Sequence, residues 1–397
     1  MQPLKGITVV ALEHAIAAPF ATRQLADLGA RVIKIERPGV GDFARGYDER
    51  VKGLASHFVW TNRSKESLTL DVKHEEAQKI LMRLIVEEAD VVVQNLAPGA
   101  AARLGVSYEA LSKIKPGIIV CDISGYGDDP HNPGPYRDKK AYDLLIQSEA
   151  GFVSVTGTSD TPAKAGNSIA DIAAGMYAYT NILAALMHKQ QTGQGQRIDV
   201  SMLESLSEWM GYPLYYAYDG ATPPPRSGAS HATIYPYGPF PAGDGKTVML
   251  GLQNEREWKV FCDKVLANPA LATDERFASN AKRSAARADL SALIVAAFST
   301  HTAEQVSALL EQAGIANAQV RTMAEVWEHP QLKARERWRE VDTSAGPIPA
   351  LLPPGSWQHG APRMDAVPAL GQHTDAILAH FGYSAARIAA LRAQGMV

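Results

Sequence analysis

The residue with the clearest capacity for chemistry is Asp171, at the start of a long apolar segment, Asn167-Ser-Ile-Ala-Asp-Ile-Ala-Ala-Gly-Met176. If that segment is helical, the carboxylate lies near a helix N-terminus. Unpaired N–H groups and the helix dipole there would hold it ionised and nucleophilic. Ser168-x-x-Asp171 also fits a plain capping box, in which the acid only satisfies backbone donors. The local sequence leaves both interpretations open.

The composition is that of an ordinary soluble chain, with 46% hydrophobic and 20% charged residues among 397. This length suffices for two domains. A net charge of -3 without a basic block argues against a nucleic-acid partner. Two cysteines, Cys121 and Cys262, provide neither a disulfide framework nor a metal-ligand cluster, and the histidines lack metal-binding spacing. The bulk numbers therefore predict no nucleic-acid partner and no metal site.

The sequence also bears on secretion and on membrane insertion. The N-terminus runs directly into a strand pattern and lacks the features of a signal peptide. The longest apolar run, around Ile182 to Met187, is too short to span a bilayer. Few cysteines fit a reducing compartment. We therefore expect a cytoplasmic protein without a membrane partner.

The first third of the chain alternates strand and helix patterns. Strands are expected at 7–12, 31–35, 90–94 and 117–121, and helices at 19–28 and 75–88. Such alternation predicts an α/β fold, in which a parallel sheet has helices on both faces and right-handed crossovers.

The pattern changes after about residue 220. Residues 220–228 are rich in Pro and Gly and predict a loop or linker. A strand at 248–252 and helices at 257–266, 281–298 and 302–313 predict a smaller α+β domain. The chain ends in a Pro-rich part and an Ala/Leu helix at 385–394.

The first βαβ unit, residues 7–36, superficially resembles a dinucleotide-binding unit, with Glu36 where a ribose-binding acid would lie. Its first turn, Glu13 to Pro19, contains no glycine, so it lacks the close backbone approach to a pyrophosphate. This argues against NAD. Arg37 suits a phosphate better, since guanidinium binds phosphate oxygens bidentately; a solvated surface arginine is the alternative.

Many short motifs occur in an informative order. They lie at 17–38, 41–42, 62–71, 94–99, 124–127, 171, 181–186, 192–204, 276–280, 329–332 and 370–374. Together they resemble the class III CoA transferases, the family that also contains the α-methylacyl-CoA racemases. No single piece is diagnostic, but the order and combination are specific and span nearly the whole chain.

The resemblance implies an architecture. The family has a large Rossmann-like domain built from both chain ends and a small α+β domain, and two chains form an interlocked-ring homodimer. Applied to this sequence, it predicts a CoA-binding domain at 1–205, a linker at 206–228, a small domain at 229–335 and a returning segment at 336–397.

The resemblance also implies a mechanism. The aspartate at the Asp171 position attacks an acyl-CoA thioester, forms a mixed anhydride and then carries CoA as an aspartyl thioester. Acyl-CoA, coenzyme A and a carboxylic acid are then substrates, and no permanently bound cofactor is expected. The alternative is racemisation, which needs a His base. Tyr142 occupies that position here, and a phenol is a poor base for the exchange.

Contacts to CoA carry over from the family position by position. The expected residues are His14, Ala15, Ala17, Arg37, Asn95, Leu96, Arg103, Lys140 and Tyr142. Asp143 falls where transferases can have a Glu near the nucleophile. Two departures are Ile16, where some transferases have Gln, and residues 226–231, which have one glycine where oxalate-using members have a glycine run. His231 there is a weaker candidate for binding an acid.

The first segment most resembles the branch that handles C4–C5 dicarboxylic acids. We therefore expect transfer from succinyl-CoA to an acid such as itaconate, mesaconate or citramalate; intramolecular transfer within mesaconyl-CoA is an alternative. The distal carboxylate needs a cation, and the candidates are Arg23, Arg45, Arg50, Arg63 and Arg226. From other classes, a nicotinamide oxidoreductase and a non-catalytic CoA-binding protein remain to be tested.

Overall fold

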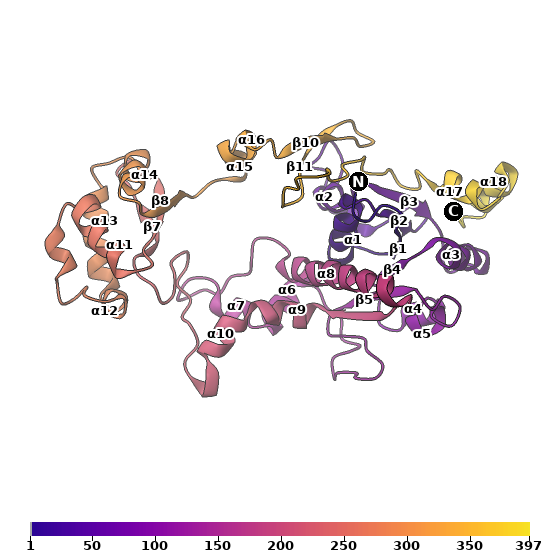
Figure 1. Ribbon diagram of the computed structural model, residues 1–397, viewed down its shortest axis with the longest axis horizontal. Helices are drawn as coiled ribbons and strands as arrows, with labels where there is room; N and C mark the ends of the chain where they lie inside the picture. The colour runs from indigo at the N-terminus through magenta and orange to yellow at the C-terminus, as the bar shows by residue number, and fades with distance from the viewer. Residues whose placement is uncertain (1) are drawn as a thin grey trace. The chain divides into compact units, whose positions relative to one another are not determined.

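The chain forms two compact units in the computed structural model, which describes residues 2–397 (Figure 1). The first, here called the sheet unit, contains residues 2–151, 165–210 and 331–397. The second, the small unit, contains residues 152–164 and 211–330. Residues 152–164, which the sequence places in the large domain, thus pack with the small unit.

The sheet unit is built on six parallel strands in the order β3-β2-β1-β4-β5-β6. The strands are β1 (Thr8–Leu12), β2 (Arg31–Glu36), β3 (Lys65–Thr69), β4 (Val91–Gln94), β5 (Ile119–Ser124) and β6 (Arg197–Ser201). This is the strand order of doubly wound dinucleotide-binding folds, in which the order reverses between β1 and β4. The predicted Rossmann-like parallel sheet is confirmed.

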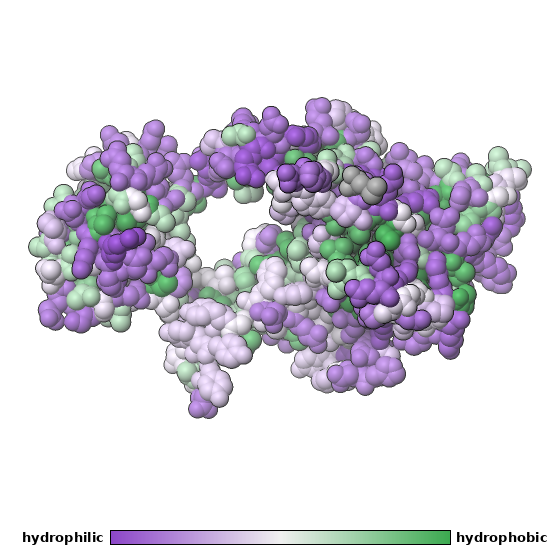
Figure 2. Space-filling view, in the orientation of Figure 1, coloured by the Kyte–Doolittle hydropathy of each residue, from purple (hydrophilic) through white to green (hydrophobic). Residues whose placement is uncertain are grey.

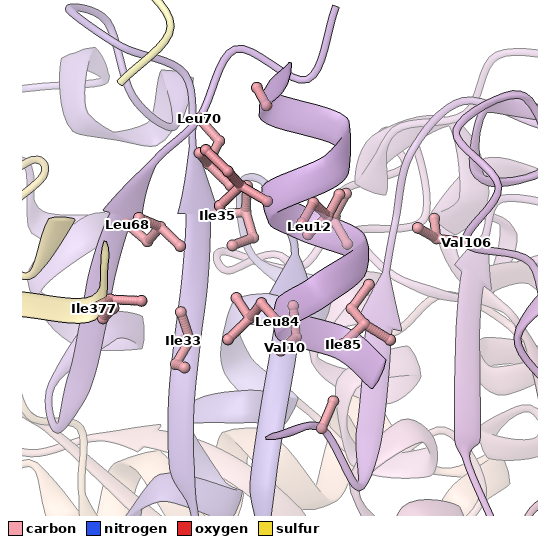
Figure 3. Packing of buried hydrophobic residues seen from close by; sticks show 14 of the residues in the cluster. Val10, Leu12, Ile33, Ile35, Leu68, Leu70, Leu84, Ile85, Val106 and Ile377 are labelled. Atoms are coloured by element: carbon pink, nitrogen blue, oxygen red, sulfur yellow. The ribbon is translucent and has the colours of Figure 1, made fainter. Parts of the chain in front are cut away.

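Helices cover both faces of this sheet. The helices of the unit are α1 (Ala17–Asp27), α2 (Ser56–Asn62), α3 (Glu75–Glu88), α4 (Ala100–Arg103), α5 (Tyr108–Leu111), α6 (Asp143–Glu149), α8 (Ile169–Thr192), α9 (Met202–Trp209), α17 (Thr374–His380) and α18 (Ala385–Ala393), with the short η1 (Phe43–Gly46). In α3, Ile80, Leu84 and Ile85 recur at helical spacing and pack on Val10 and Ile33 (Figure 3). Helices α1 and α8 pack along each other on the other face.

The C-terminal segment returns to the edge strand β3. His373 Nδ1 accepts the Ser67 N–H at 3.1 Å, and Thr374 Oγ1 accepts the Thr69 N–H at 3.0 Å. Before it, β10 (Trp338–Val341) and β11 (Ile348–Leu351) form an antiparallel hairpin. The returning chain thereby covers a sheet edge that would otherwise expose unpaired backbone groups.

The small unit is α+β. Its antiparallel sheet has the order β7-β8-β9, with β7 (Tyr237–Pro241), β8 (Thr247–Gly251) and β9 (Ala316–Gln319). Its helices are α7 (Phe152–Val155), α10 (Gly211–Tyr216), η2 (Tyr218–Gly220), α11 (Glu255–Val260), η3 (Phe261–Val265), η4 (Pro269–Ala272), α12 (Asn280–Ala285), α13 (Arg287–Phe298), α14 (Ala303–Gln312) and α15 (Met323–Trp327); α16 (Pro330–Ala334) lies at the boundary. Trp258, Phe277 and Phe298 are central in its core.

Three sequence predictions differ from the structure. The helix expected at 281–298 is two helices, because Ala286 leaves helical geometry with φ -94° and ψ 30°. The helix expected at 257–266 ends at Val260 and continues as the wider turn η3. Strands β3 and β6 were not expected, since their charged and polar residues hide the strand pattern.

Helix α8 also corrects the expectation about apolar length. By length and composition alone, it is the one helix of the described residues that could cross a membrane. The core helix of a soluble protein passes the same test. Here one face of α8 packs against α1, β5 and β6, and 39% of its most apolar window is buried.

Candidate active site

The candidate site begins at the turn between β1 and α1, beside the point where the strand order reverses. His14 donates its backbone N–H to Asn95 Oδ1 at 2.9 Å, and Asn95 Nδ2 donates to the His14 carbonyl at 2.9 Å. Asn95 directly follows β4. One side chain therefore ties the carboxyl ends of β1 and β4 together, at the place where such folds bind ligands.

Asp171 lies in the first turn of α8, and a glycine brings it to α1. A Cβ on Gly175, one turn further along α8, would lie 2.7 Å from the Ala17 carbonyl oxygen and 2.9 Å from the Phe20 ring. Only glycine permits this approach. In the resulting geometry the Asp171 carboxylate lies near the N-terminus of α1, where the Ala17 backbone N–H acts to lower its pKa.

The electrostatics of Asp171 differ from the sequence expectation. Burial and the nearby charge of Asp143 raise its pKa to about 7, against the lowering effect of the Ala17 hydrogen bond. The helix dipole therefore does not keep it firmly ionised, as the position alone suggested. The capping-box interpretation is also wrong, since the Ser168 side chain makes no capping hydrogen bond.

Asp143 takes the capping role that was expected of Ser168. Its Oδ1 accepts the Ala170 N–H at 2.9 Å, at the start of α8, and its Oδ2 accepts from Gln147 Nε2 at 2.7 Å. Gln147 is fully buried and receives the Ala165 N–H at 2.9 Å. Asp143 is thereby held beside Asp171 as a second carboxylate.

Aromatic rings line the approach to this pair. The His14 ring stacks on Phe43 at 5.4 Å, and Tyr47 lies between Phe43 and His57 at 5.8 and 5.5 Å. Burial and the charges of Asp42 and Asp171 raise the pKa of Tyr47 to about 12. Burial lowers the pKa of His14, whose Nδ1 is buried with no hydrogen-bond partner among the described residues. A neutral imidazole with an unused polar atom fits a ligand-binding turn.

The remaining predicted CoA contacts differ in how far their side chains are buried. Ala15 adopts a left-handed backbone, with φ 60°, and Ala17 is buried. Leu96 is half-buried and packs against the sheet core. Four more are exposed: Arg37, Arg103, Lys140 and Tyr142. Exposed cations can reach the phosphates of a long ligand, whereas Tyr142, 68% exposed, is not enclosed as a catalytic base would be.

The structure separates the arginine candidates for a distal carboxylate. Arg23 and Arg63 are buried and both pair with Asp27. Arg45 binds Glu36 through two hydrogen bonds of 2.8 and 2.7 Å.

Arg226 donates to the carbonyls of Ser154, Thr158 and Ser159, and so holds a loop. Arg50 is exposed, and the structure shows no partner for its guanidinium among residues 2–397. Within the described part of the chain, Arg50 is therefore the exposed candidate whose guanidinium makes no pairing, whereas the unpartnered Nε of Arg23 is buried.

Glu36 is engaged as well. Although burial opposes its ionisation, hydrogen bonds and charge from Arg45, with Lys34 and Ser67, hold its pKa at about 2. Its oxygens are used by Arg45, Ser67 and the Asp42 N–H. It has no capacity left for a ribose, which agrees with the glycine-free turn in speaking against NAD.

Comparison with known proteins decides the family. The model of CoA-transferase family III matches residues 4–374. The chain belongs to this family. It is 33% identical to a succinate–glutarate CoA-transferase of Agrobacterium fabrum, over 95% of each protein. It is 32% identical to a succinyl-CoA–D-citramalate CoA-transferase of Chloroflexus aurantiacus, over 94% of this chain and 92% of that protein.

A solved structure agrees with this assignment. A CaiB/BaiF family protein from Brucella suis superposes with a TM-score of 0.83 at 34% identity, over 95% of this chain and 99% of that one. The chain is therefore a class III CoA transferase, as the motif order predicted, and CoA thioesters are its substrates.

Asp143 and Asn95 were expected at the site, but their tertiary contacts were not, and Phe43 and Tyr47 were missed. Nothing local marked Asp143 as the cap of α8, Asn95 as the clamp of the first turn, or Phe43 and Tyr47 as neighbours of His14. One signal was available: Gly175 follows Asp171 by one helical turn, on the same face. A glycine there predicts close approach of another backbone.

Proposed function

We propose that this CoA transferase moves CoA from succinyl-CoA to a C4–C5 dicarboxylic acid, with Asp171 as the nucleophile. The observation that carries the proposal is the Asp171 carboxylate itself. It is largely buried at the meeting of two helix N-termini, and it makes no ion pair with a lysine or arginine of residues 2–397. A carboxylate without a counter-cation keeps its lone pairs for an incoming carbonyl.

The reaction then proceeds by carboxylate exchange. The Asp171 carboxylate attacks the thioester carbonyl, the C–S bond breaks, and CoA leaves as a thiolate from a mixed anhydride. The thiolate attacks the Asp171 carbonyl, releases the donor acid and leaves an aspartyl-CoA thioester. The acceptor carboxylate repeats the two steps in reverse. No net proton is transferred, and no ATP is required.

The neighbouring groups support these steps. Asp143 raises the energy of the Asp171 anion by like charge, and such an anion is a stronger nucleophile. The burial that raises the pKa of Asp171 also limits access of water, which would hydrolyse an anhydride. We place the thioester end of CoA at His14, Ala15 and Ala17.

The rest of CoA is proposed to follow the exposed cations. Arg37, Arg103 and Lys140 are suited to the phosphates, and Asn95 and Leu96 to the wall beside the turn. For the distal carboxylate of the acid we propose Arg50, because it is exposed and each of the other four candidate arginines is bound to a carboxylate or to backbone carbonyls. Two relatives are named as CoA-transferases that act with glutarate and with citramalate, and these names support an acid of this size.

We propose that the active form is an interlocked homodimer in the cytoplasm. The segment around α9 and α10 exposes several large side chains: Trp209, Tyr212, Leu214, Tyr215, Tyr216 and Tyr218. The surface over α10 is drawn in pale colours, between the polar and apolar ends of the scale (Figure 2). Exposed aromatic groups of this kind are enriched in protein interfaces.

Measurement of CoA transfer to a panel of acids tests the proposal. Purified enzyme is incubated with succinyl-CoA and, in turn, glutarate, itaconate, mesaconate, citramalate, malate, oxalate and monocarboxylic acids, and new CoA esters are quantified. Transfer to C4–C5 dicarboxylates is expected, with a raised KM in Arg50→Ala. Transfer only to monocarboxylic or aromatic acids would contradict it. Incorporation of solvent deuterium at the α-carbon, without transfer, would indicate racemisation instead.

A further inference from the structure

Four charged side chains are buried together beneath the β1–α1 turn: Glu13, Lys34, Asp42 and Lys65, here called the buried charge cluster. Lys34 Nζ lies 2.8 Å from Asp42 Oδ2 and 3.3 Å from Glu13 Oε1, and Lys65 Nζ lies 2.7 Å from Glu13 Oε1. Removing charges from water is costly, and apolar residues often stabilise such sites as well or better. The cluster therefore needs an explanation beyond stability.

The cluster is connected to the backbone of the turn. Asp42 Oδ1 accepts the N–H groups of Ala15 and Ala44 at 3.1 and 2.9 Å, while Lys34 Nζ donates to the Glu13 carbonyl at 3.3 Å. Ala15 has a φ of 60°, a left-handed conformation that is unfavourable for a residue with a Cβ. The hydrogen bond from its N–H to Asp42 holds it there.

The conformation of this turn directly affects the surroundings of Asp171. Two residues after Ala15, Ala17 packs against the helix that carries Asp171: a Cβ on Gly175 would lie 2.7 Å from the Ala17 carbonyl oxygen. The Ala17 N–H also acts to lower the pKa of Asp171. A displacement of the turn would move that donor, and the reaction geometry with it. In dinucleotide-binding folds glycines shape this turn; here a buried salt bridge does so for a chain that has no glycine between Glu13 and Pro19.

We propose that Lys34 and Asp42 are positioning residues for the transfer reaction: their ion pair fixes residues 14–17 where Ala17 packs against the N-terminal turns of α8, which carry Asp171. The inference rests on the proposed role of Asp171 as nucleophile. Lys34 neutralises and orients Asp42, and Asp42 Oδ1 holds the Ala15 N–H. Neither side chain needs to touch the substrate.

A second buried ion cluster provides the matched control. Asp27, near the C-terminal end of α1, is 1% exposed and pairs with Arg63 at 2.8 Å and Arg23 at 2.6 Å. Its side chain touches neither the turn nor Asp171. Loss of Asp27 therefore reports the general effect of breaking a buried ion pair in the same unit.

The test compares Asp42→Ala with Asp27→Ala in single-turnover acyl transfer to Asp171 from succinyl-CoA, followed as a function of pH. Without its Ala17 donor, the Asp171 carboxylate is less stabilised, so its pKa rises. For Asp42→Ala we expect the midpoint of the acid limb to move to higher pH and the rate at pH 7 to fall about tenfold or more. Asp27→Ala should keep the wild-type midpoint.

A second variant guards against misfolding. Lys34→Met/Asp42→Leu removes the same acceptor but leaves none of that pair as an unpaired buried charge, and it should show the same upward shift. A wild-type midpoint in both variants, or an equal shift in Asp27→Ala, would overturn the inference while leaving Asp171 as nucleophile. If wild-type enzyme forms no acyl-Asp171, the proposed function fails, and the inference fails with it.

Discussion

Two groups of carboxylates in the sheet unit lie close to the same turn but have opposite environments. In the buried charge cluster, burial opposes the ionisation of Glu13, yet the charges of Lys65 and Lys34 hold its pKa below the ordinary value. At the candidate site, burial and a second carboxylate, Asp143, raise the pKa of Asp171 to about 7. One group has its charges compensated; the other has two acids and no paired lysine or arginine among residues 2–397.

The difference teaches how this chain separates structural acids from a reactive one. A buried carboxylate paired with lysine has its lone pairs occupied and its charge stabilised, so it is a poor nucleophile. A buried carboxylate next to another acid is destabilised by like charge. Forming a neutral acyl derivative removes that repulsion. Both groups are buried, so the difference between them is whether a lysine pairs with the carboxylate.

The largest effect is expected from Asp171→Asn, which removes the nucleophile and keeps the shape. Transfer should fall by at least about 10³-fold, as for other variants that lose a covalent nucleophile. The measurement is steady-state transfer from succinyl-CoA. The control is Asp375→Asn, an exposed aspartate in the first turn of α17, which should retain wild-type activity. Equal losses of transfer activity in both variants would show that the effect is not specific to Asp171.

Stability should change in opposite directions in the two groups. Glu13→Gln removes the carboxylate that pairs with Lys65 and leaves Lys34 with Asp42 alone, so it should lower the free energy of unfolding by about 3–5 kcal/mol. Asp171→Asn should raise it at pH 8 by up to about 4 kcal/mol, because ionisation of an acid whose pKa rises from 3.8 to about 7 on folding opposes the folded state.

The pH dependence provides the control for these stability changes. The gain from Asp171→Asn should be complete above pH 7 and vanish below pH 4, the interval between the unfolded and folded pKa values. Glu13 has a lowered pKa, so its contribution persists at high pH and is lost as the pH falls through the folded value. Urea unfolding at several pH values measures both. The same sign of change at pH 8 would break the comparison.

Gly175→Ala tests the contact that brings Asp171 to α1. The new Cβ would lie 2.7 Å from the Ala17 carbonyl oxygen, so α8 must shift away from α1 and carry Asp171 away from the Ala17 N–H. We expect transfer to fall about 10- to 100-fold, the range for small misplacements of reacting groups. Gly134→Ala, where a Cβ meets nothing within 4 Å, is the matched control. Unchanged transfer in Gly175→Ala would show that the close approach is dispensable.

The smallest predicted effect is a shift in the pH–rate profile. Transfer should rise about tenfold per pH unit below 7 and level off above it, because Asp171 must be ionised to attack. Asp143→Asn keeps an oxygen for the Ala170 N–H but removes the like charge, so the midpoint should move to lower pH. Glu149→Gln, on the same helix α6, should leave it in place. An unmoved midpoint in Asp143→Asn would assign the raised pKa to burial alone.

The sequence predicted those parts of the fold whose local pattern matches their burial. Helix α3 occupies Glu75–Glu88, as the apolar period indicated, and β1, β2 and β4 were expected within a residue or so of their observed ends. Strand β3, Lys65–Thr69, was not expected, because its charged residues are satisfied only by partners elsewhere in the chain. Tertiary ion pairs leave no local signal.

The candidate site shows the same division. Asp171 could be selected from its motif, and the family resemblance supplied a role. Its environment could not be derived, because Asp143 lies 28 residues earlier in the chain and Asn95 earlier still. The expectation of a firmly ionised acid failed for this reason: the sequence showed the helix terminus and the resemblance offered Asp143 as a neighbouring acid, whereas the burial of Asp171 had no local signal.

The most direct test of the account is to trap the acyl-enzyme. The protein is incubated with succinyl-CoA, quenched with hydroxylamine or borohydride, digested and analysed by peptide mass spectrometry. The account predicts a mass change confined to the peptide that contains Asp171, and its absence in Asp171→Asn. Modification of another residue, or none while new CoA esters still accumulate, would contradict it.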